Sequence, residues 1–178
     1  MRYDQLEHAI RAACDVAKDT ELLIFGSQAI LGSFPEAPES LRASIEVDVQ
    51  PKNMTEKTVF VDGALGQDSI FHQTHGFYVH GISIEAATLP EGWEDRTISV
   101  SNEYRTRGCI GHCLEAHDLA ASKLVAYREK DREFVTILLN ERLIEGTTLL
   151  ERIAQLPVGE DVRNRLVKWV RITMEEIS

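Results

Sequence analysis

The eight residues RASIEVDV, at positions 42–49, constrain this chain most, because polar and apolar side chains alternate strictly along them. In a β-strand, successive side chains point to opposite faces of the sheet. The apolar set is Ala43, Ile45, Val47 and Val49, and the polar set is Arg42, Ser44, Glu46 and Asp48. We therefore expect a half-buried strand whose polar face is open to chemistry.

Two carboxylates, Glu46 and Asp48, share the polar face of this predicted strand. Residues two apart in a strand have Cα atoms about 6.6 Å apart, so both side chains can reach one ion. At an effective dielectric constant of 20, two such charges repel each other by about 2.5 kcal/mol. The sequence therefore predicts a positively charged group between them.

A short apolar run precedes the acidic strand. Residues 21–25 (ELLIF) predict a strand that ends at Gly26 and Ser27, and residues 27–34 have helical spacing. Backbone N–H groups at such a turn can bind phosphate when a helix follows, whereas an ordinary turn with an N-cap is the simpler explanation. Mg²⁺ binds through one or two carboxylates plus substrate phosphates, so turn and acidic strand together predict a metal-nucleotide site.

The remaining patterns predict an α+β fold with a mixed sheet of four or five strands. Residues 76–89 and 96–102 alternate as strands, with a turn at 90–95, and Glu85 on the first is a candidate third carboxylate. From Glu115 onward the pattern is helical, and the sequence leaves open whether 128–133 lies within one helix or separates two. We expect an α/β core over residues 1–112 and a helical subdomain over 113–178.

Composition limits the functional classes. The formal net charge of −10 argues against broad attraction to nucleic acid, although it leaves a local basic groove open. No apolar run is long enough to cross a bilayer, and the amphipathic N-terminal 19 residues lack the apolar core of a signal peptide. We expect a cytoplasmic protein without membrane partners, whose three cysteines are reduced thiols.

Four segments together resemble a known superfamily. They are FGSQAIL at 25–31, R-x-S-x-E-x-D at 42–48, SIFHQTHGFYVHGISIEAATLPEGWEDR at 69–96 and HDLAASKLVAYREKDREFV at 117–135. This chain resembles the nucleotidyltransferases, which combine a Gly-Ser turn with an acidic D-x-D strand. More closely it is similar to the group containing AbiEii-type toxins and the DUF6036 family. The chain departs from the superfamily pattern at Glu46, where Asp is usual.

The resemblance implies roles for the first half of the chain. Gly26 and Ser27 would hold the triphosphate of an NTP, and Glu46 and Asp48 would bind Mg²⁺ and act in catalysis. The fold implied is a nucleotidyltransferase-like mixed sheet with helices, followed by a helical subdomain.

The resemblance also implies catalytic roles for Lys123 and Asp131. Lys123 would neutralise the phosphates of the nucleotide, since lysine is a compact phosphate-binding charge. Asp131 would orient Lys123 or Arg128, act as a base, or complete the metal site. Arg42 and Ser44 would either contact the nucleotide or brace the strand.

The reaction implied is Mg²⁺-dependent transfer of a nucleoside monophosphate from an NTP to a hydroxyl acceptor. This acceptor would be either an RNA 3′ end, such as that of tRNA, or a protein side chain. A toxin of a toxin-antitoxin system, with an antitoxin partner, is the implied biological role. The alternative is a catalytically inactive protein of the same fold that serves as a binding or antitoxin-like partner, which the change to Glu46 permits. An RNA-binding module using basic residues within 165–171 ranks last because of the net charge.

Several other polar residues have ordinary structural explanations. Asp118 is predicted to cap the helix that follows it. His72, His75 and His80 are predicted to be strand and turn residues rather than metal ligands. The cysteines and histidines within 109–117 do not have the spacing of a standard zinc site.

Overall fold

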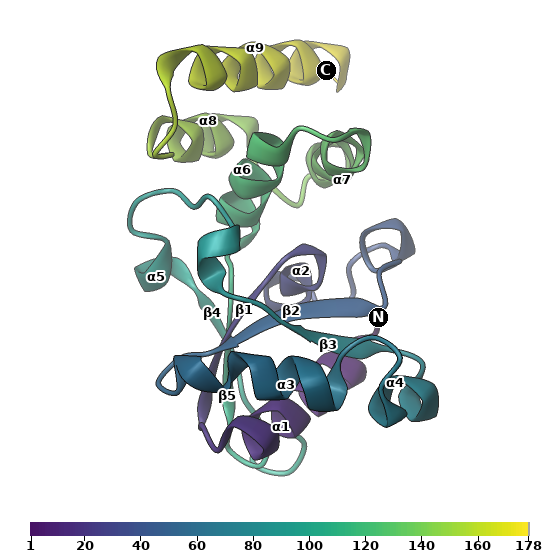
Figure 1. Cartoon of the computed structure of the whole chain (residues 1–178). Coiled ribbons are helices and arrows are strands. Elements are labelled where there is room, and N and C mark those ends of the chain that lie inside the picture. Colours follow the sequence, from purple (N-terminus) through teal and green to yellow (C-terminus); the bar gives the residue numbers. More distant parts are fainter. Residues whose placement is uncertain (178) are drawn as a thin grey trace. The chain divides into compact units, whose positions relative to one another are not determined.

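A computed structural model describes residues 1–177 of the chain, which form two compact units (Figure 1). Unit 1 comprises Met1–Ala86 and Thr97–Leu114, and unit 2 comprises Ala87–Arg96 and the residues from Glu115 onward. Unit 1 contains the sheet and unit 2 is helical, so the predicted α+β class is confirmed. Each unit is described by itself below.

Within the described residues, unit 1 is built on a mixed sheet of five strands in the order β3-β2-β1-β5-β4. The strands are β1 (Glu21–Phe25), β2 (Glu46–Pro51), β3 (Tyr78–Gly81), β4 (Ile98–Val100) and β5 (Ile110–Cys113). β1 pairs antiparallel with β2 and parallel with β5, β2 pairs parallel with β3, and β4 pairs antiparallel with β5.

Two helices, α1 (Tyr3–Ala17) and α3 (Thr58–Leu65), pack against each other and against the strands (Figure 1). α1 buries an apolar stripe at three- and four-residue spacing, which comprises Leu6, Ala9, Ile10, Ala13 and Ala17. In β2, Val47 and Val49 are fully buried, and the alternation of the strand turns Glu46 and Asp48 the other way. Two short helices, α2 (Ile30–Ser33) and α4 (Ile70–His75), complete unit 1.

The predicted strand over 42–49 is wrong in its first half. β2 begins at Glu46, after a 3₁₀ turn at Glu39–Leu41, and Ala43 and Ile45 are exposed. The β1 strand ends at Phe25, opposite Asp48, so residues 42–45 run past the end of that neighbour. Without a strand on that side, their apolar side chains have no surface to pack on.

The later strands also differ from their prediction. β3 is only four residues long, and Ile84–Ala86 form a 3₁₀ turn, so Glu85 does not lie on a strand. The predicted turn at 90–95 contains a short helix, α5 (Trp93–Arg96). β5 was not predicted, because Gly111 and His112 interrupt its apolar pattern. It forms because it pairs with a strand on each side.

Unit 2 contains α6 (Ala116–Ala126), α7 (Glu129–Asn140), α8 (Gly146–Ala154) and α9 (Glu160–Ile177). The chain breaks between α6 and α7 at Tyr127, whose φ of 54° is left-handed. The question left open by the sequence is therefore answered, because two helices, not one, run through this region. Tyr127 ends α6 in the conformation that C-terminal caps adopt.

The predicted capping role of Asp118 is wrong. The helix α6 is capped by Glu115, whose carboxylate accepts hydrogen bonds from the backbone of His117 and Asp118. Asp118 itself is completely buried and accepts two hydrogen bonds from Arg96, from Nε at 2.8 Å and Nη2 at 2.9 Å. Nε of Arg152 lies 3.2 Å from the same carboxylate.

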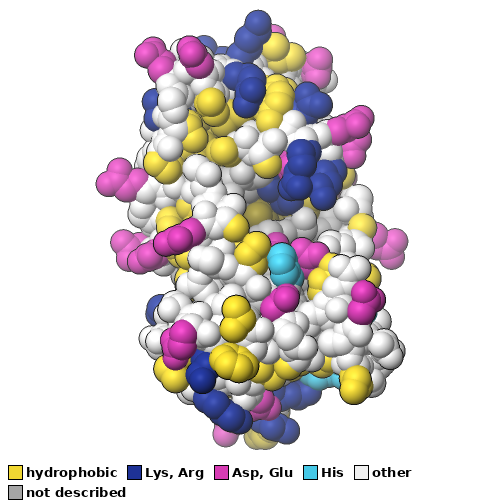
Figure 2. Space-filling view, viewed as in Figure 1, with side chains coloured by type: hydrophobic (Ala, Val, Ile, Leu, Met, Phe, Trp, Pro, Cys, Tyr) yellow, Lys and Arg dark blue, Asp and Glu magenta, His cyan; other side chains and the backbone are white. Residues whose placement is uncertain are grey.

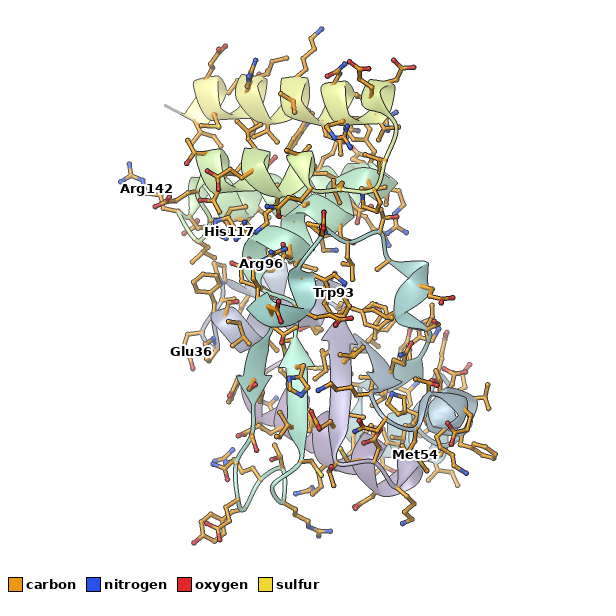
Figure 3. The ribbon with its side chains drawn as sticks, turned by 90° about the vertical axis from the view of Figure 1, so that its left-hand side faces the viewer. Glu36, Met54, Trp93, Arg96, His117 and Arg142 are labelled. Atoms are coloured by element: carbon orange, nitrogen blue, oxygen red, sulfur yellow. The ribbon has the colours of Figure 1, made fainter. Side chains whose placement is uncertain are left out.

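This ion pair explains why residues 87–96 belong to unit 2. Figure 3 shows Arg96 close to His117, at the beginning of α6. Glu91 adds a backbone hydrogen bond of 2.9 Å to the carbonyl of Gln155. A segment that is distant in sequence from the helices is therefore fastened to them by a buried bidentate ion pair.

A second buried carboxylate, Asp19, fastens the start of β1 to the end of β2. It accepts hydrogen bonds from the backbone N–H groups of Glu21, Asn53 and Met54 and from the Asn53 side chain, at 2.7–3.1 Å. Burial alone would raise the pKa of Asp19, but these hydrogen bonds outweigh it and lower that pKa below 3.8.

Among residues 1–177, no helix combines the length and the apolar character that crossing a bilayer requires.

Asp19→Asn should lower the free energy of unfolding at pH 7 by about 1–3 kcal/mol. The asparagine amide has one acceptor oxygen, so it cannot accept all of the hydrogen bonds that the two oxygens of the aspartate accept. The folded-state pKa of Asp19 is depressed, so its stabilisation is present above pH 3.8 and is lost as pH falls through the folded pKa. Urea unfolding followed by circular dichroism at pH 7, 4 and 3 measures this. A difference between variant and parent that stays constant or grows toward pH 3 would contradict it.

Asp118→Asn should destabilise unit 2 by about 3–5 kcal/mol, because Arg96 and Arg152 would lose their buried anion. Both tryptophans of the chain, Trp93 and Trp169, lie in unit 2, so their fluorescence reports its unfolding in urea. Asp95→Asn, at an exposed neighbouring position, is the control. Equal midpoints for the two variants would show that the ion pair does not stabilise the unit.

Candidate metal and nucleotide site

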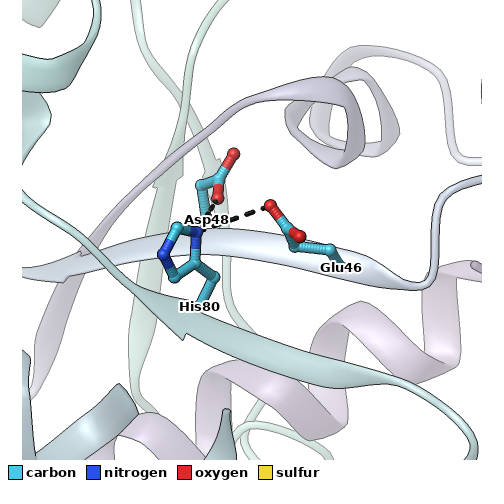
Figure 4. A group of neighbouring side chains, drawn as sticks. All are labelled: Glu46, Asp48 and His80. Carbon is cyan, nitrogen blue, oxygen red and sulfur yellow. Dashed lines mark hydrogen bonds and ion pairs between the residues drawn. The ribbon is translucent and has the colours of Figure 1, made fainter. Parts of the chain in front are cut away.

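Strand pairing in unit 1 brings four polar side chains onto one face of the sheet. The register between β2 and β3 places Glu46 beside Tyr78 and Asp48 beside His80. Nδ1 of His80 lies 2.9 Å from Oδ1 of Asp48 and 3.4 Å from Oε1 of Glu46 (Figure 4). The Tyr78 hydroxyl donates a hydrogen bond to Oε2 of Glu46. The group that contacts both carboxylates in this structure is thus an imidazole.

The cluster is half-exposed, with side-chain exposures of 37% for Glu46, 23% for Asp48 and 38% for His80. Figure 2 shows a histidine side chain beside acidic side chains on the surface turned to the viewer. A ligand can therefore reach these groups from solvent. Their ligand atoms all lie within 4.8 Å of one another, the spacing of a group that can hold a metal ion.

Burial and the neighbouring charge of Glu46 raise the pKa of Asp48 to about 6, against the opposing effect of His80. Burial would also raise the pKa of Glu46, but hydrogen bonds from Tyr78 and Asp48 and the charge of His80 bring it below its usual value. Burial lowers the pKa of His80, and the two carboxylates more than reverse this and raise it. The two carboxylates and the imidazole therefore shift one another's pKa values.

Gly26 lies directly against Asp48. Its φ is +68°, and a Cβ at this position would come 2.1 Å from Oδ2 of Asp48. A side chain here would displace the carboxylate, and the left-handed φ also favours glycine. The predicted association of the Gly-Ser turn with the acidic strand is therefore present in the geometry of unit 1. Gly26 keeps the space beside the Asp48 carboxylate free of a side chain.

The helix that follows Gly26 is shorter than the sequence predicted. Ser27–Ala29 form a 3₁₀ turn and α2 adds only four residues, so the dipole of this element contributes little to anion binding. Gln28, in the 3₁₀ turn, is fully buried, and its carboxamide has no hydrogen-bond partner among residues 1–177. A phosphate bound at this turn would therefore be held by close approach to the backbone N–H groups of the turn, and not by the dipole of a helix.

Arg42 and Ser44 lie in the segment before β2. The Ser44 hydroxyl accepts a hydrogen bond of 3.2 Å from the backbone N–H of Glu46, so it braces the beginning of the strand. The backbone carbonyl of Arg42 accepts a hydrogen bond from the N-terminal amine of Met1. Contact of either residue with a nucleotide stays a prediction.

The second pair of predicted site residues lies in unit 2. Nζ of Lys123 lies 3.6 Å from Oδ1 of Asp131 and 4.4 Å from the centroid of the Phe134 ring. Arg128 donates to Oδ2 of Asp131 at 2.7 Å. Burial lowers the pKa of Lys123, an effect that Asp131 opposes. Asp131 therefore contacts both Lys123 and Arg128, and its role in catalysis stays a prediction.

The residues present in unit 1 fit a divalent cation. Two carboxylates supply oxygen ligands, and Gly26 leaves room beside one of them for phosphate oxygens. His80 was predicted to be an ordinary strand residue, and its place in the cluster was missed. A sequence signal did exist, since His80 belongs to an alternating strand pattern, but the register with Asp48 cannot be read from either strand alone.

Comparison with known proteins gives one family. A model described as "Nucleotidyltransferase of unknown function (DUF6036)" matches residues 2–173. No curated protein and no solved structure gives a significant match. The match spans nearly the whole chain, and it confirms the resemblance to the nucleotidyltransferases and to the DUF6036 family. The chain therefore belongs to the DUF6036 family and is, at that level of description, a nucleotidyltransferase.

Proposed function

We propose that this protein transfers a nucleoside monophosphate from an NTP to a hydroxyl acceptor in a Mg²⁺-dependent reaction. The observation that carries the proposal is the contact between Gly26 and Asp48, on a strand that also presents Glu46. This arrangement supplies the two halves of a metal-nucleotide site, carboxylates for the ion and open backbone for phosphate oxygens.

In the reaction proposed, the acceptor hydroxyl oxygen forms a bond to the α-phosphorus and the bond to pyrophosphate breaks. The hydroxyl proton passes to a base, and pyrophosphate leaves. A bound Mg²⁺ would supply positive charge to the phosphates and make the hydroxyl easier to ionise. Glu46 and Asp48 would hold that ion, and Tyr78 would fix the orientation of Glu46 through its hydrogen bond.

The backbone of Gly26 and Ser27 would hold the triphosphate, with Arg42 and Ser44 as further candidate contacts to the nucleotide. The proposal assigns Lys123 the role of neutralising phosphate charge, on its chemistry and on the family resemblance. Asp131 lies 3.6 Å from its ammonium group and would position it. Asp131 is held in turn by Arg128, so the lysine has a fixed direction.

The biological role that we propose is that of a toxin, which rests on the resemblance to AbiEii-type proteins alone. The acceptor would be an RNA 3′ end, such as that of tRNA, or a serine or tyrosine of a protein. An antitoxin is then the partner. A cytoplasmic location would suit each of these acceptors.

Asp48→Asn should abolish transfer, with more than a hundredfold loss of rate, because the amide replaces an anionic metal ligand. The parent, incubated with each labelled NTP, Mg²⁺ and total tRNA or cell protein, should label an acceptor. Asp68→Asn is the control, since it removes a carboxylate from an exposed position whose left-handed φ suits asparagine.

If the parent labels no acceptor and does not bind Mg²⁺-NTP, the proposed enzymatic activity is wrong. The alternative, a catalytically inactive binding protein of the same fold, would then be favoured. For the toxin role, the parent should arrest growth of cells that express it, and Asp48→Asn should not. Equal growth arrest by the parent and by Asp48→Asn would show that the toxicity does not depend on nucleotide transfer.

Lys123→Met should lower kcat/KM for the NTP by about a hundredfold or more, because a charge-assisted contact to phosphate is lost. Methionine retains the apolar stem over Phe134, and Asp131 keeps its partner Arg128, so folding should survive. Lys130→Met, on the exposed start of α7, removes the same charge and serves as the control. Equal kinetics for the two variants would remove Lys123 from the proposed mechanism.

A further inference from the structure

His80 occupies a position in the carboxylate cluster that a strand histidine need not occupy. It lies on β3, directly beside Asp48 in the parallel register, and turns Nδ1 toward both carboxylates. Figure 4 shows the imidazole and the two acidic side chains converging from the two neighbouring strands. The chain thus presents three donor atoms, two oxygens and one nitrogen, around one point.

We propose that His80 is the third protein ligand of the metal site, and that its nitrogen makes the site bind Mn²⁺ more tightly than Mg²⁺. This inference rests on the proposed function, since it concerns the ion that Glu46 and Asp48 would hold.

The distances suit coordination. Two ligand atoms about 2.1–2.2 Å from one ion, at right angles to each other, lie about 3.0 Å apart. The His80 nitrogen lies 2.9 Å from an oxygen of Asp48 and 3.4 Å from an oxygen of Glu46, close to this spacing, and all three ligand atoms lie within 4.8 Å of one another. An ion can therefore enter between these three side chains with little movement of their ligand atoms. The imidazole is 38% exposed, so an ion can reach its nitrogen from solvent.

The surrounding hydrogen bonds direct the ligand atoms. Tyr78 donates to Oε2 of Glu46, which leaves Oε1 turned toward His80. Such outer contacts fix the orientation of a ligand, and their loss usually weakens metal binding. The extra methylene of Glu46 allows its carboxylate to reach Tyr78 and His80 on the neighbouring strand. The departure from the usual Asp and the presence of His80 are therefore parts of one arrangement.

The mixed donor set decides the metal preference. Mg²⁺ takes oxygen ligands almost entirely and dehydrates reluctantly, so an imidazole adds little to its affinity. Divalent transition ions accept imidazole nitrogen alongside carboxylate oxygens. Mn²⁺ accepts the two carboxylates as readily as Mg²⁺ and gains the nitrogen in addition. Mg²⁺ can still serve the reaction where it is the abundant ion.

The test measures binding of Mn²⁺ and Mg²⁺ to the full chain by calorimetry, and pulsed electron paramagnetic resonance of the bound Mn²⁺. The parent should show the ¹⁴N coupling of a directly bound imidazole, which changes when the histidines are labelled with ¹⁵N. His80→Gln should lose this coupling, weaken Mn²⁺ binding at least tenfold and change Mg²⁺ binding less than threefold. His112→Gln is the control, because His112 is likewise paired with a carboxylate, Glu21, in unit 1.

Mn²⁺ bound without nitrogen coupling, or an unchanged ratio of Mn²⁺ to Mg²⁺ affinity in His80→Gln, would overturn the inference. Either result leaves the proposed function standing, because the carboxylates would still hold the ion. Absence of binding by both metals, with and without a nonhydrolysable NTP, would overturn the proposed function as well. Loss of the coupling in His112→Gln would assign the nitrogen to a different histidine and reject His80.

Discussion

The pairing of β2 with both of its neighbours determines where the groups of the candidate site in unit 1 lie. The antiparallel register with β1 sets Asp48 opposite Phe25, and so brings its carboxylate against Gly26. The parallel register with β3 sets His80 beside Asp48. A slip of one residue would turn the polar side chains of β2 into the core. The burial of Val47 and Val49, about 1.5–3 kcal/mol for each side chain, holds the register in place.

This register brings like charges together, and the fold offsets their repulsion locally. The imidazole of His80 and the hydroxyl of Tyr78 both contact the carboxylates, and both come from β3. These contacts also orient the donor atoms of the cluster, which all lie within 4.8 Å of one another. Because these side chains are already ordered, the free-energy cost of ordering them when an ion binds is smaller.

Unit 2 uses buried ion pairs in two different ways. Asp118 joins two arginines and fastens the segment 87–96 to the helices, a structural role. Asp131 is also buried, but one of its partners is Lys123, whose ammonium group lies over the Phe134 ring. Burial lowers the pKa of that lysine while the carboxylate opposes the change. A lysine held in this way has a defined direction, which is what contact with phosphate requires.

The sequence alone determined the class of the fold, because hydrophobic periodicity separates a strand-rich first part from a helical last part. It also determined the family and the pair Glu46 and Asp48, since side-chain alternation is local and needs no partner. It overestimated the acidic strand, missed β5, and read Asp118 as a cap. Each of these errors concerns a residue whose environment is made by segments distant in the sequence.

Only the tertiary structure decided which groups meet the two carboxylates. Gly26 and His80 are separated from Asp48 by 22 and 32 residues, and strand pairing joins them. The physical reason is that register depends on the burial of whole strands, whereas a motif records only neighbours along the chain. The sequence therefore predicted a positively charged group between Glu46 and Asp48, and the fold decided that an imidazole contacts both carboxylates.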